Sequence, residues 1–183
     1  MKQKINYLIG YMKKQESKFF VTSDTFFGRV NKAAERGFET VEEMDETLVE
    51  NWNAKVGKGD VVVHLGNFAW TPNHVEGILE RLNGTIIFLL GDRDQALVKV
   101  AKVNEDIKLQ QEQILTHDNV ILSHWPLEIW PGKDKDFYHF HGHAEPGLRT
   151  DIKLMKRVNA CCDHWSLAPI EIKDTIDLLS DFM

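Results

Sequence analysis

Residues that can bind a cation recur in five short motifs, each after an apolar run. The motifs are Ser23–Gly28, His64–Phe68, Leu90–Asp94, Ser123–Pro126 and His141–Glu145. Each combines a Gly or Pro turn signal with a carboxylate, amide or imidazole, the groups that hold divalent metals in proteins. Because short apolar runs bounded by turn residues are typical of buried strands, the recurrence predicts one site built from loops at the ends of several strands.

Strand and helix patterns alternate along the chain and supply the elements that would position these loops. Continuous apolar runs predict strands, and apolar residues at helical spacing or a Thr-Pro start predict helices. The expected strands are 18–22, 60–65, 85–90, 107–115, 119–123, 137–141 and 158–162, and the expected helices are 41–52, 71–82, 95–103 and 171–182. We therefore expect one α/β domain over residues 1–183, with two packed sheets.

The composition fits a globular domain and disfavours several classes of function. Of the 183 residues, 43% are hydrophobic and 27% are charged, which is ordinary for a chain with a buried core. The net charge of -6 argues against non-specific nucleic-acid binding. No apolar run reaches the length of a signal-peptide core or a membrane span. We expect a cytoplasmic protein.

The two cysteines, Cys161 and Cys162, are neighbours in the sequence. They cannot bridge distant segments, which is consistent with a reducing compartment. Such a pair can chelate a soft metal or act in redox chemistry. More commonly, one thiol of the pair packs inward and the other faces outward on a strand.

In this order and spacing, the five motifs resemble those of small calcineurin-like metallophosphoesterases, the single-domain kind found in bacteria and phages. The match extends from about Phe19 to about Pro169 and includes Asn51-Trp52-Asn53 and the turn at Asn83-Gly84. The resemblance implies a two-sheet α/β sandwich flanked by helices, with the site on strand-end loops. It also implies hydrolysis of phosphate esters by two divalent metals that hold a hydroxide between them.

The metal-binding positions of that family are only partly kept. Asp24, His124 and His143 match the pattern. Phe26 stands where the family has a histidine ligand, and Asn67 stands where it has the aspartate that bridges the two metals. Because an amide carries no charge, it cannot replace the bridging carboxylate between two cations. We therefore expect no two-metal centre.

The other ligands implied by the resemblance sort into two unequal metal positions. The first position would keep Asp24, with Glu145 in place of a histidine and the weak amide oxygen of Asn67. The second position would have Asp92 in place of an asparagine, together with His124, His143 and Asn67. Oxygen and imidazole ligands suit one divalent ion, so we expect either no metal or a single Mn, Zn, Fe or Ni ion.

Two arginines stand where the resemblance places histidines. Arg93 replaces the catalytic histidine, and Arg29 stands where this type of protein often has a further one. A guanidinium group is always protonated and cannot cycle a proton, but it pairs with carboxylates and binds phosphate through two bonds. We expect Arg93 to pair with an acidic neighbour among Asp24, Asp92, Asp94 and Glu145, the alternative being a side chain in solvent. We expect Arg29 to approach a phosphate at the site mouth.

Other residues near the motifs have a structural interpretation beside the functional one. His64, His139 and His141 lie in strands that lead to site loops, and we expect core positions for them. Trp125, Trp130, Phe137 and Tyr138 flank the His124 loop and form either an aromatic rim for a ligand or partner, or part of the core.

These features together predict a degenerate metallophosphoesterase-fold protein, a pseudoenzyme that binds a protein partner or a phosphate-bearing ligand. The alternative is a slow single-metal phosphoesterase in which Asp92, His124 and His143 hold the ion and Arg93 grips the phosphate. Metal content and turnover of an aryl phosphodiester distinguish the two functions.

Overall fold

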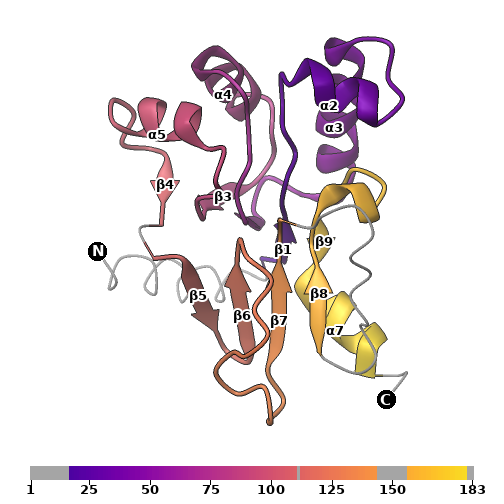
Figure 1. The fold of residues 1–183 in the computed structure, drawn as a ribbon, viewed down its shortest axis with the longest axis vertical. Helices are drawn as coiled ribbons and strands as arrows, with labels where there is room; N and C mark the ends of the chain where they lie inside the picture. Colours follow the sequence, from indigo (N-terminus) through magenta and orange to yellow (C-terminus); the bar gives the residue numbers. More distant parts are fainter. Residues whose placement is uncertain (1–16, 111, 144–155, 181–183) are drawn as a thin grey trace.

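The computed structural model of the protein describes residues 17–110, 112–143 and 156–180, which form two mixed sheets flanked by helices (Figure 1). The first sheet has the order β4-β3-β2-β1-β9, and the second has the order β5-β6-β7-β8. In the first sheet β1 to β4 run parallel and β9 is antiparallel to β1. In the second sheet β6 to β8 run parallel and β5 is antiparallel to β6.

The strands are short. Those of the first sheet are β1 (Phe19–Thr22), β2 (Val61–His64), β3 (Thr85–Phe88), β4 (Lys108–Leu109) and β9 (Ile170–Glu171). Those of the second sheet are β5 (Ile114–His117), β6 (Val120–Ser123), β7 (Tyr138–His141) and β8 (Arg157–Asn159).

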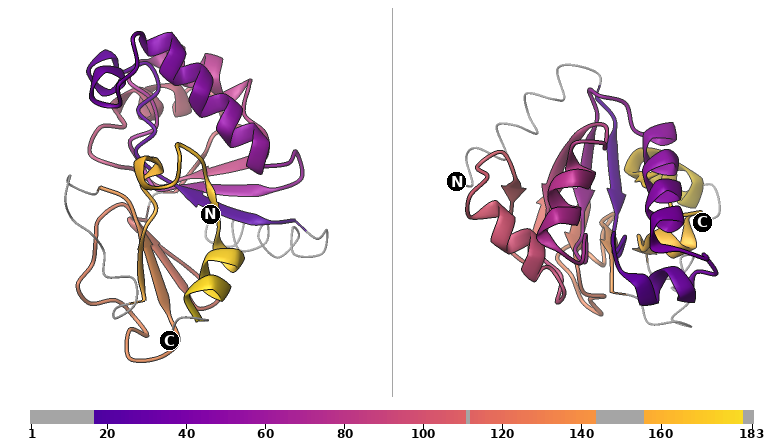
Figure 2. Two further views of the ribbon diagram at one scale, coloured as in Figure 1. Left: turned by 90° about the vertical axis from the view of Figure 1, so that its right-hand side faces the viewer. Right: turned by 90° about the horizontal axis from the view of Figure 1, so that it is seen from above.

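The helices lie mainly on the outer face of the first sheet. They are α2 (Val30–Glu35), α3 (Val41–Lys55), α4 (Pro72–Leu79) and α5 (Gln95–Ala101), with the 3-10 turn η2 (Cys162–His164) and α7 (Ile172–Ser180) later in the chain. Figure 2 shows α2 to α4 on one side of the first sheet and the second sheet on its other side, with α7 beside the second sheet. The layers are therefore helix, sheet and sheet.

Alternating side chains of the first sheet fill two separate cores. Phe20 and Val62 pack with helix residues such as Trp52, in the layer between the helices and the first sheet. Val21 and Val63 pack with residues of the second sheet and α7. Because successive strand residues face opposite sides, these apolar runs are buried on both faces, as expected for parallel strands covered on each side.

The structure confirms most expected elements and corrects one strand. Thr40 and Thr71 accept backbone hydrogen bonds at the starts of α3 and α4, and Pro72 stands in the first turn of α4. The predicted strand 107–115 is wrong as a single element, because the chain crosses between sheets there. Its first part is β4 of the first sheet, and its last part begins β5 of the second.

The expectation of one inward and one outward cysteine is also wrong. Cys161 and Cys162 are 5% and 1% exposed and both thiols are free. The strand β8 ends at Asn159, so side-chain alternation does not extend through the pair. Cys161 forms an isolated bridge with Ser23, and Cys162 begins the turn η2.

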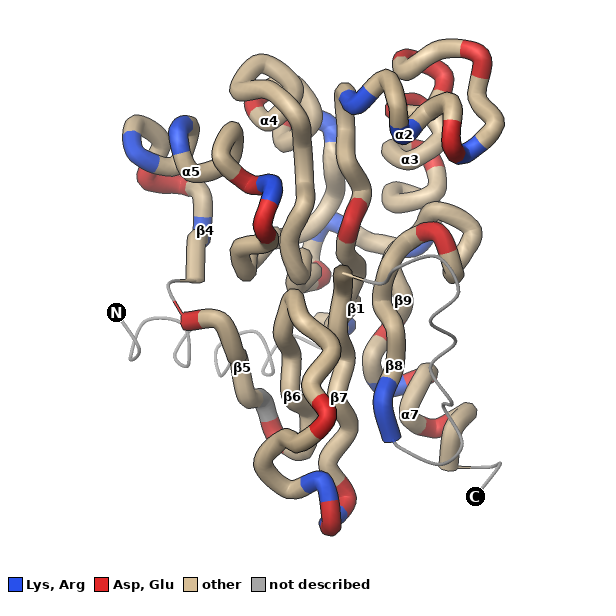
Figure 3. The backbone as a smooth tube through the Cα atoms, in the orientation of Figure 1, with Lys and Arg blue, Asp and Glu red and all other residues tan. Residues whose placement is uncertain are grey.

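The charged residues do not gather into a basic face. Figure 3 shows Lys and Arg segments scattered among Asp and Glu segments along the described chain. Within the described ranges, no helix combines the length and the apolar character needed to cross a bilayer.

Candidate metal centre

Loops from five strands of the two sheets meet at one site. They follow β1, β2, β3, β6 and β7, and they carry Asp24, Asn67, Asp92, His124 and His143. Hydrogen bonds and short contacts connect these five side chains directly. The predicted convergence of the strand-end motifs is therefore confirmed.

The site loops pack so closely that two positions require glycine. A Cβ atom at Gly66 would lie 2.4 Å from the backbone nitrogen of Gly91, and one at Gly91 would lie 2.5 Å from Oδ1 of Asn67. Gly66 also has a φ of +107°, which side chains rarely adopt. These glycines bring the β2 and β3 loops into direct contact, which places Asn67 beside Asp92.

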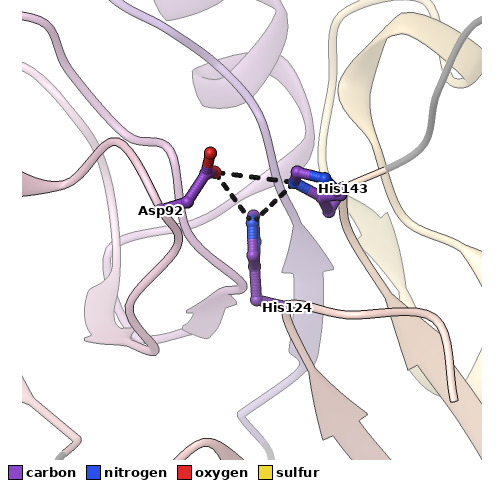
Figure 4. A group of neighbouring side chains, drawn as sticks. All are labelled: Asp92, His124 and His143. Carbon is purple, nitrogen blue, oxygen red and sulfur yellow. Dashed lines mark hydrogen bonds and ion pairs between the residues drawn. The ribbon is translucent and has the colours of Figure 1, made fainter.

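Asp92, His124 and His143 form a three-residue group of metal-ligand type (Figure 4). Oδ1 of Asp92 lies 3.4 Å from Nε2 of His124 and 3.5 Å from Nδ1 of His143. The two ring nitrogens are 3.2 Å apart. Tetrahedral ligands about 2.1 Å from one ion lie about 3.4 Å from each other. The three atoms therefore have the spacing that one divalent cation requires.

A hydrogen bond on the side of the ring opposite the metal-ligand group fixes the orientation of His124. Nδ1 of His124 donates to the backbone carbonyl of Leu65 at 2.7 Å, so the proton is on Nδ1 and the lone pair of Nε2 faces the group. The ring is buried, with 1% exposure. Hydrogen bonding of the rear nitrogen to a carbonyl is the common way in which proteins orient a histidine ligand.

The carboxylate of Asp92 is held ionised. Burial opposes its ionisation, but the hydrogen bond from Asn67 and the neighbouring His143 ring and Arg93 guanidinium outweigh burial and lower the pKa. Nε of Arg93 lies 3.0 Å from Oδ2 of Asp92, so the expected ion pair is present. The Arg93 side chain is nevertheless 58% exposed, so it combines the pairing with the solvent exposure of the alternative.

Asn67 links two carboxylates through its amide nitrogen. Nδ2 donates to Oδ1 of Asp24 at 2.9 Å and to Oδ1 of Asp92 at 3.1 Å. Its Oδ1 accepts from the backbone nitrogen of Arg93 at 2.9 Å, which assigns the orientation of the amide. The oxygen predicted as a weak metal ligand therefore points to the backbone, and the N–H donors face the carboxylates.

The carboxylate of Asp24 is buried and accepts hydrogen bonds from neighbouring protein groups. Its Oδ2 accepts from Ser23 Oγ at 2.8 Å and from the backbone nitrogen of His143 at 2.9 Å, and the residue is 5% exposed. Both bonds end on Oδ2, whereas Oδ1 accepts from Asn67, and the bond to the backbone of His143 fixes the loop that carries this residue. Glu145, the other residue expected there, lies outside the described residues. Among the described residues, the group of metal-ligand type is Asp92, His124 and His143.

Four site residues have left-handed backbone conformations. The φ angles are +55° at Asp24, +53° at Phe26, +61° at Asn67 and +46° at His143. Such conformations cost roughly 1–3 kcal/mol each for residues other than glycine and persist where surrounding contacts enforce them. Their concentration at this site is typical of a functional constellation.

Two residues that support the site lay beyond what the sequence indicated. Asp94, predicted only as a partner for Arg93, instead accepts from the backbone nitrogens of Asn67, Phe68 and Gly91 at 2.7–2.8 Å. Burial raises its pKa although these three bonds oppose the rise. Asp94 thus ties the β2 loop to the β3 loop.

Arg36 holds the β1 loop from the other side. Its guanidinium donates to the carbonyls of Asp24 and Thr25 at 2.8 Å each and pairs with Asp163 at 2.7 Å. The sequence around Arg36 gives no local sign of this role, because its partners are backbone atoms and Asp163, which lies 127 positions away.

The remaining predicted residues divide between core and rim. His64, His139 and His141 are fully buried, as expected, and burial lowers their pKa values to about 3, 3 and 4. Trp125 is 41% exposed and its ring centre lies 4.1 Å from that of His143, which makes it a rim residue. Trp130 and Tyr138 belong to the interior, with 3% and 5% exposure.

Comparisons with known proteins show a related fold and no named activity. No family model matches this sequence. An uncharacterized protein of Methanocaldococcus jannaschii is 40% identical over 83 residues, which cover 43% of this chain and 47% of that protein, so the match spans about half of the curated relative. The crystal structure of a protein of unknown function from Aquifex aeolicus superposes with a TM-score of 0.68 at 20% identity, covering 89% of this chain and all of that chain. This likeness shows that the two proteins share an α/β fold.

Proposed function

We propose that this protein binds one divalent cation through Asp92, His124 and His143, and that it uses this site to bind a phosphate-bearing ligand rather than to hydrolyse one. The scaffold would be that of a metallophosphoesterase whose two-metal centre has been replaced. The ligand spacing of 3.2–3.5 Å supports the single ion. Bound there, the ion would supply a positive charge for phosphoryl oxygens.

The observation that carries the proposal is the amide of Asn67 between Asp24 and Asp92. A two-metal phosphoesterase needs a carboxylate at the bridging position, because that group must hold two cations and offset their charge. In this protein N–H donors face the two neighbouring carboxylates instead, at 2.9 and 3.1 Å. The geometry therefore favours a site in which a second ion has no place.

Arg93 supports binding over turnover. It stands at the position of the family's catalytic histidine, and a guanidinium group cannot give and take the proton of a leaving group at neutral pH. Its charge is paired with Asp92 at 3.0 Å. We place a phosphate-bearing ligand before a protein partner because Arg93 and Arg29 bring positive charge to the site loops.

One feature favours the alternative of a slow single-metal phosphoesterase. Three protein ligands leave a position open around a tetrahedral ion, and catalytic zinc sites keep such a position for water. This alternative uses the same three residues and is separated from the proposal by activity alone.

Metal content and turnover test both functions. After reconstitution with Mn, Zn or Ni, elemental analysis should find about one ion per chain, lost in His143→Ala and kept in the matched control His164→Ala, whose histidine is exposed. Turnover of bis(4-nitrophenyl) phosphate should not exceed that of His143→Ala. Two ions per chain would contradict the proposal, and turnover that depends on His143 would establish the alternative.

A further inference from the structure

The loop after β1 presents a guanidinium group against two aromatic rings. The Cζ atom of Arg29 lies 4.7 Å from the centre of the Phe26 ring and 4.9 Å from that of Trp70. We call these three residues the arginine–aromatic cluster. Trp70 is 47% exposed, so nearly half of the surface of this residue is open to solvent. Cation–π contacts of this kind hold a guanidinium group by its faces and leave its N–H edges free.

Arg29 differs from the other arginines of the described chain. Each of the other four donates to a carboxylate or a carbonyl of the protein: Arg36, Arg81, Arg93 and Arg157. The guanidinium of Arg29 has neither kind of partner among residues 17–110, 112–143 and 156–180. Its five donors are therefore not used by carboxylates or carbonyls of the described residues, whereas the charge of Arg93 is paired with Asp92.

The backbone that carries the cluster is fixed before any ligand arrives. Both carboxylate oxygens of Asp45 accept from the backbone nitrogen of Gly28 at 3.0 Å, and the backbone nitrogen of Trp70 donates to Phe27 at 2.8 Å. Phe26 has a φ of +53°, a rare conformation for an aromatic residue, and its ring contacts Arg29 in that conformation. A group held in this way loses little freedom on binding a ligand.

The cluster is adjacent to the proposed metal site. The backbone nitrogen of Phe26 donates to the carbonyl of Asn67 at 3.0 Å, and the side chain of Asn67 donates to Asp92 at 3.1 Å. A single residue thus separates the aromatic ring from a ligand of the ion. One small molecule bearing an anionic group and a flat ring would match both features of the cluster.

We propose that the arginine–aromatic cluster binds a mononucleotide, with the phosphate on the N–H edge of Arg29 and the base stacked on the exposed face of Trp70. Guanidinium groups bind phosphate through two parallel bonds, and every base offers a flat face to an indole ring. This inference rests on the proposed function in one respect, because it names the class of phosphate-bearing ligand. The phosphate grip itself uses Arg29 and does not require the ion.

Calorimetric titration of the metal-free full-length chain with adenosine 5′-monophosphate, inorganic phosphate and adenosine tests the proposal. The monophosphate should bind at least about tenfold more tightly than phosphate or adenosine alone, because only it engages both groups. Arg29→Gln should weaken the binding of the monophosphate and of phosphate. Arg81→Gln is the matched control, since Arg81 pairs with Glu46 on the surface, and it should change neither.

Replacement of Trp70 separates stacking from charge. Trp70→Ala should weaken the binding of the monophosphate by about 5- to 100-fold and leave the affinity for phosphate unchanged. Trp70→Phe should keep most of the affinity for the monophosphate, because it keeps an aromatic ring. Equal affinities for monophosphate and phosphate in the wild type would overturn the proposal. So would a loss with Trp125→Ala in place of Trp70→Ala, which would put the base on the other rim.

Comparison with the metal-loaded protein distinguishes failure of this inference from failure of the proposed function. Monophosphate binding that persists in His143→Ala and disappears in Arg29→Gln supports the cluster even where no ion binds. If monophosphate binding required the ion and were unchanged in Arg29→Gln, the phosphate would be bound by the metal. That result would refute nucleotide binding by the arginine–aromatic cluster and would remain consistent with the proposed metal site.

Discussion

Replacing Asn67 with aspartate tests the link between the two site carboxylates most directly. The amide nitrogen donates to Asp24 at 2.9 Å and to Asp92 at 3.1 Å. The variant Asn67→Asp would remove both donors and would bring a third carboxylate about as close to the other two. The perturbation changes one side-chain atom type and keeps the shape, so a loss of stability would report on charge and hydrogen bonding.

The size of the loss is limited by proton uptake. At an effective dielectric constant of about 20, two like charges about 3 Å apart repel by about 5 kcal/mol. The new carboxyl group would instead remain protonated, and holding a group with an ordinary pKa near 4 in that form at pH 7 costs about 4 kcal/mol. We therefore expect the free energy of unfolding to fall by about 4 kcal/mol at pH 7, a large part of the roughly 5–15 kcal/mol of a typical domain.

The sign of the pH dependence follows from the raised pKa of the new group. Its folded-state pKa would lie above its unfolded value, so the folded chain would bind the extra proton. The penalty would be nearly absent below about pH 4 and would grow by about 1.4 kcal/mol per pH unit towards neutrality. Urea denaturation at pH 5, 6 and 7, each with and without Mn, measures this change. The metal should restore stability because a cation offsets the gathered carboxylates.

Asn53→Asp is the matched control. Its amide donates to the backbone carbonyl of Arg81 at 2.9 Å and accepts from the backbone of Asn83, away from the metal group. This variant should lose about 1 kcal/mol, the usual contribution of one hydrogen bond, with no response to Mn. If metal-free Asn67→Asp were as stable as the wild type at pH 7, the amide could not be stabilising the pair Asp24 and Asp92.

Two further predictions concern charge in and around the site. Because burial lowers the pKa of His64, His139 and His141 to about 3, 3 and 4 while the unfolded chain binds these protons near pH 6.5, the free energy of unfolding should fall between pH 7 and pH 5 by about 2 kcal/mol per histidine. Urea denaturation at several pH values should show that the wild type takes up about three protons on unfolding. The variant His139→Gln should take up about two, and the control His164→Gln about three. If His139→Gln left the slope of the unfolding free energy against pH unchanged, the assignment would be wrong. Arg93→Ala should cost less than about 1 kcal/mol of stability, because the side chain is 58% exposed, and should tighten divalent-cation binding by removing a charge 3.0 Å from Asp92; weaker binding by calorimetry would refute this role.

The sequence predicted the site loops because their signals are local. Apolar runs of four to six residues followed by a turn residue and a ligand-type side chain identify the ends of β1, β2, β3, β6 and β7 without knowledge of the sheet order. The same logic failed for residues 107–115. Hydrophobicity there is compatible with one strand or two, and the crossing from β4 to β5 depends on which sheet each half joins.

The hydrogen-bond partners within the site were beyond the sequence for a different reason. Asp94 accepts from three backbone N–H groups, and Arg36 donates to two backbone carbonyls, so these contacts leave no pattern of side-chain types. The orientation of the Asn67 amide likewise depends on the backbone nitrogen of Arg93. Residue types could indicate which groups gather at the site, and only the folded backbone decides which atoms they present.

Asn67 and Asp92 exchange an amide and a carboxylate relative to the family that the motifs resemble. Position 67 has the amide, where the resemblance implies a bridging aspartate, and Asp92 has the carboxylate, where it implies an asparagine. In the proposed single-ion site the Asp92 carboxylate lies beside His124 and His143, whose nitrogens are 3.4 and 3.5 Å from it. A carboxylate beside two imidazoles suits one cation, and under the proposed function the Asn67 amide that donates to Asp24 and Asp92 would stabilise these side chains where the resemblance implies a second ion. Restoring the family's order in Asn67→Asp together with Asp92→Asn should therefore move the site towards two ions only if Phe26 is also replaced by histidine, because the first metal position would still lack that ligand.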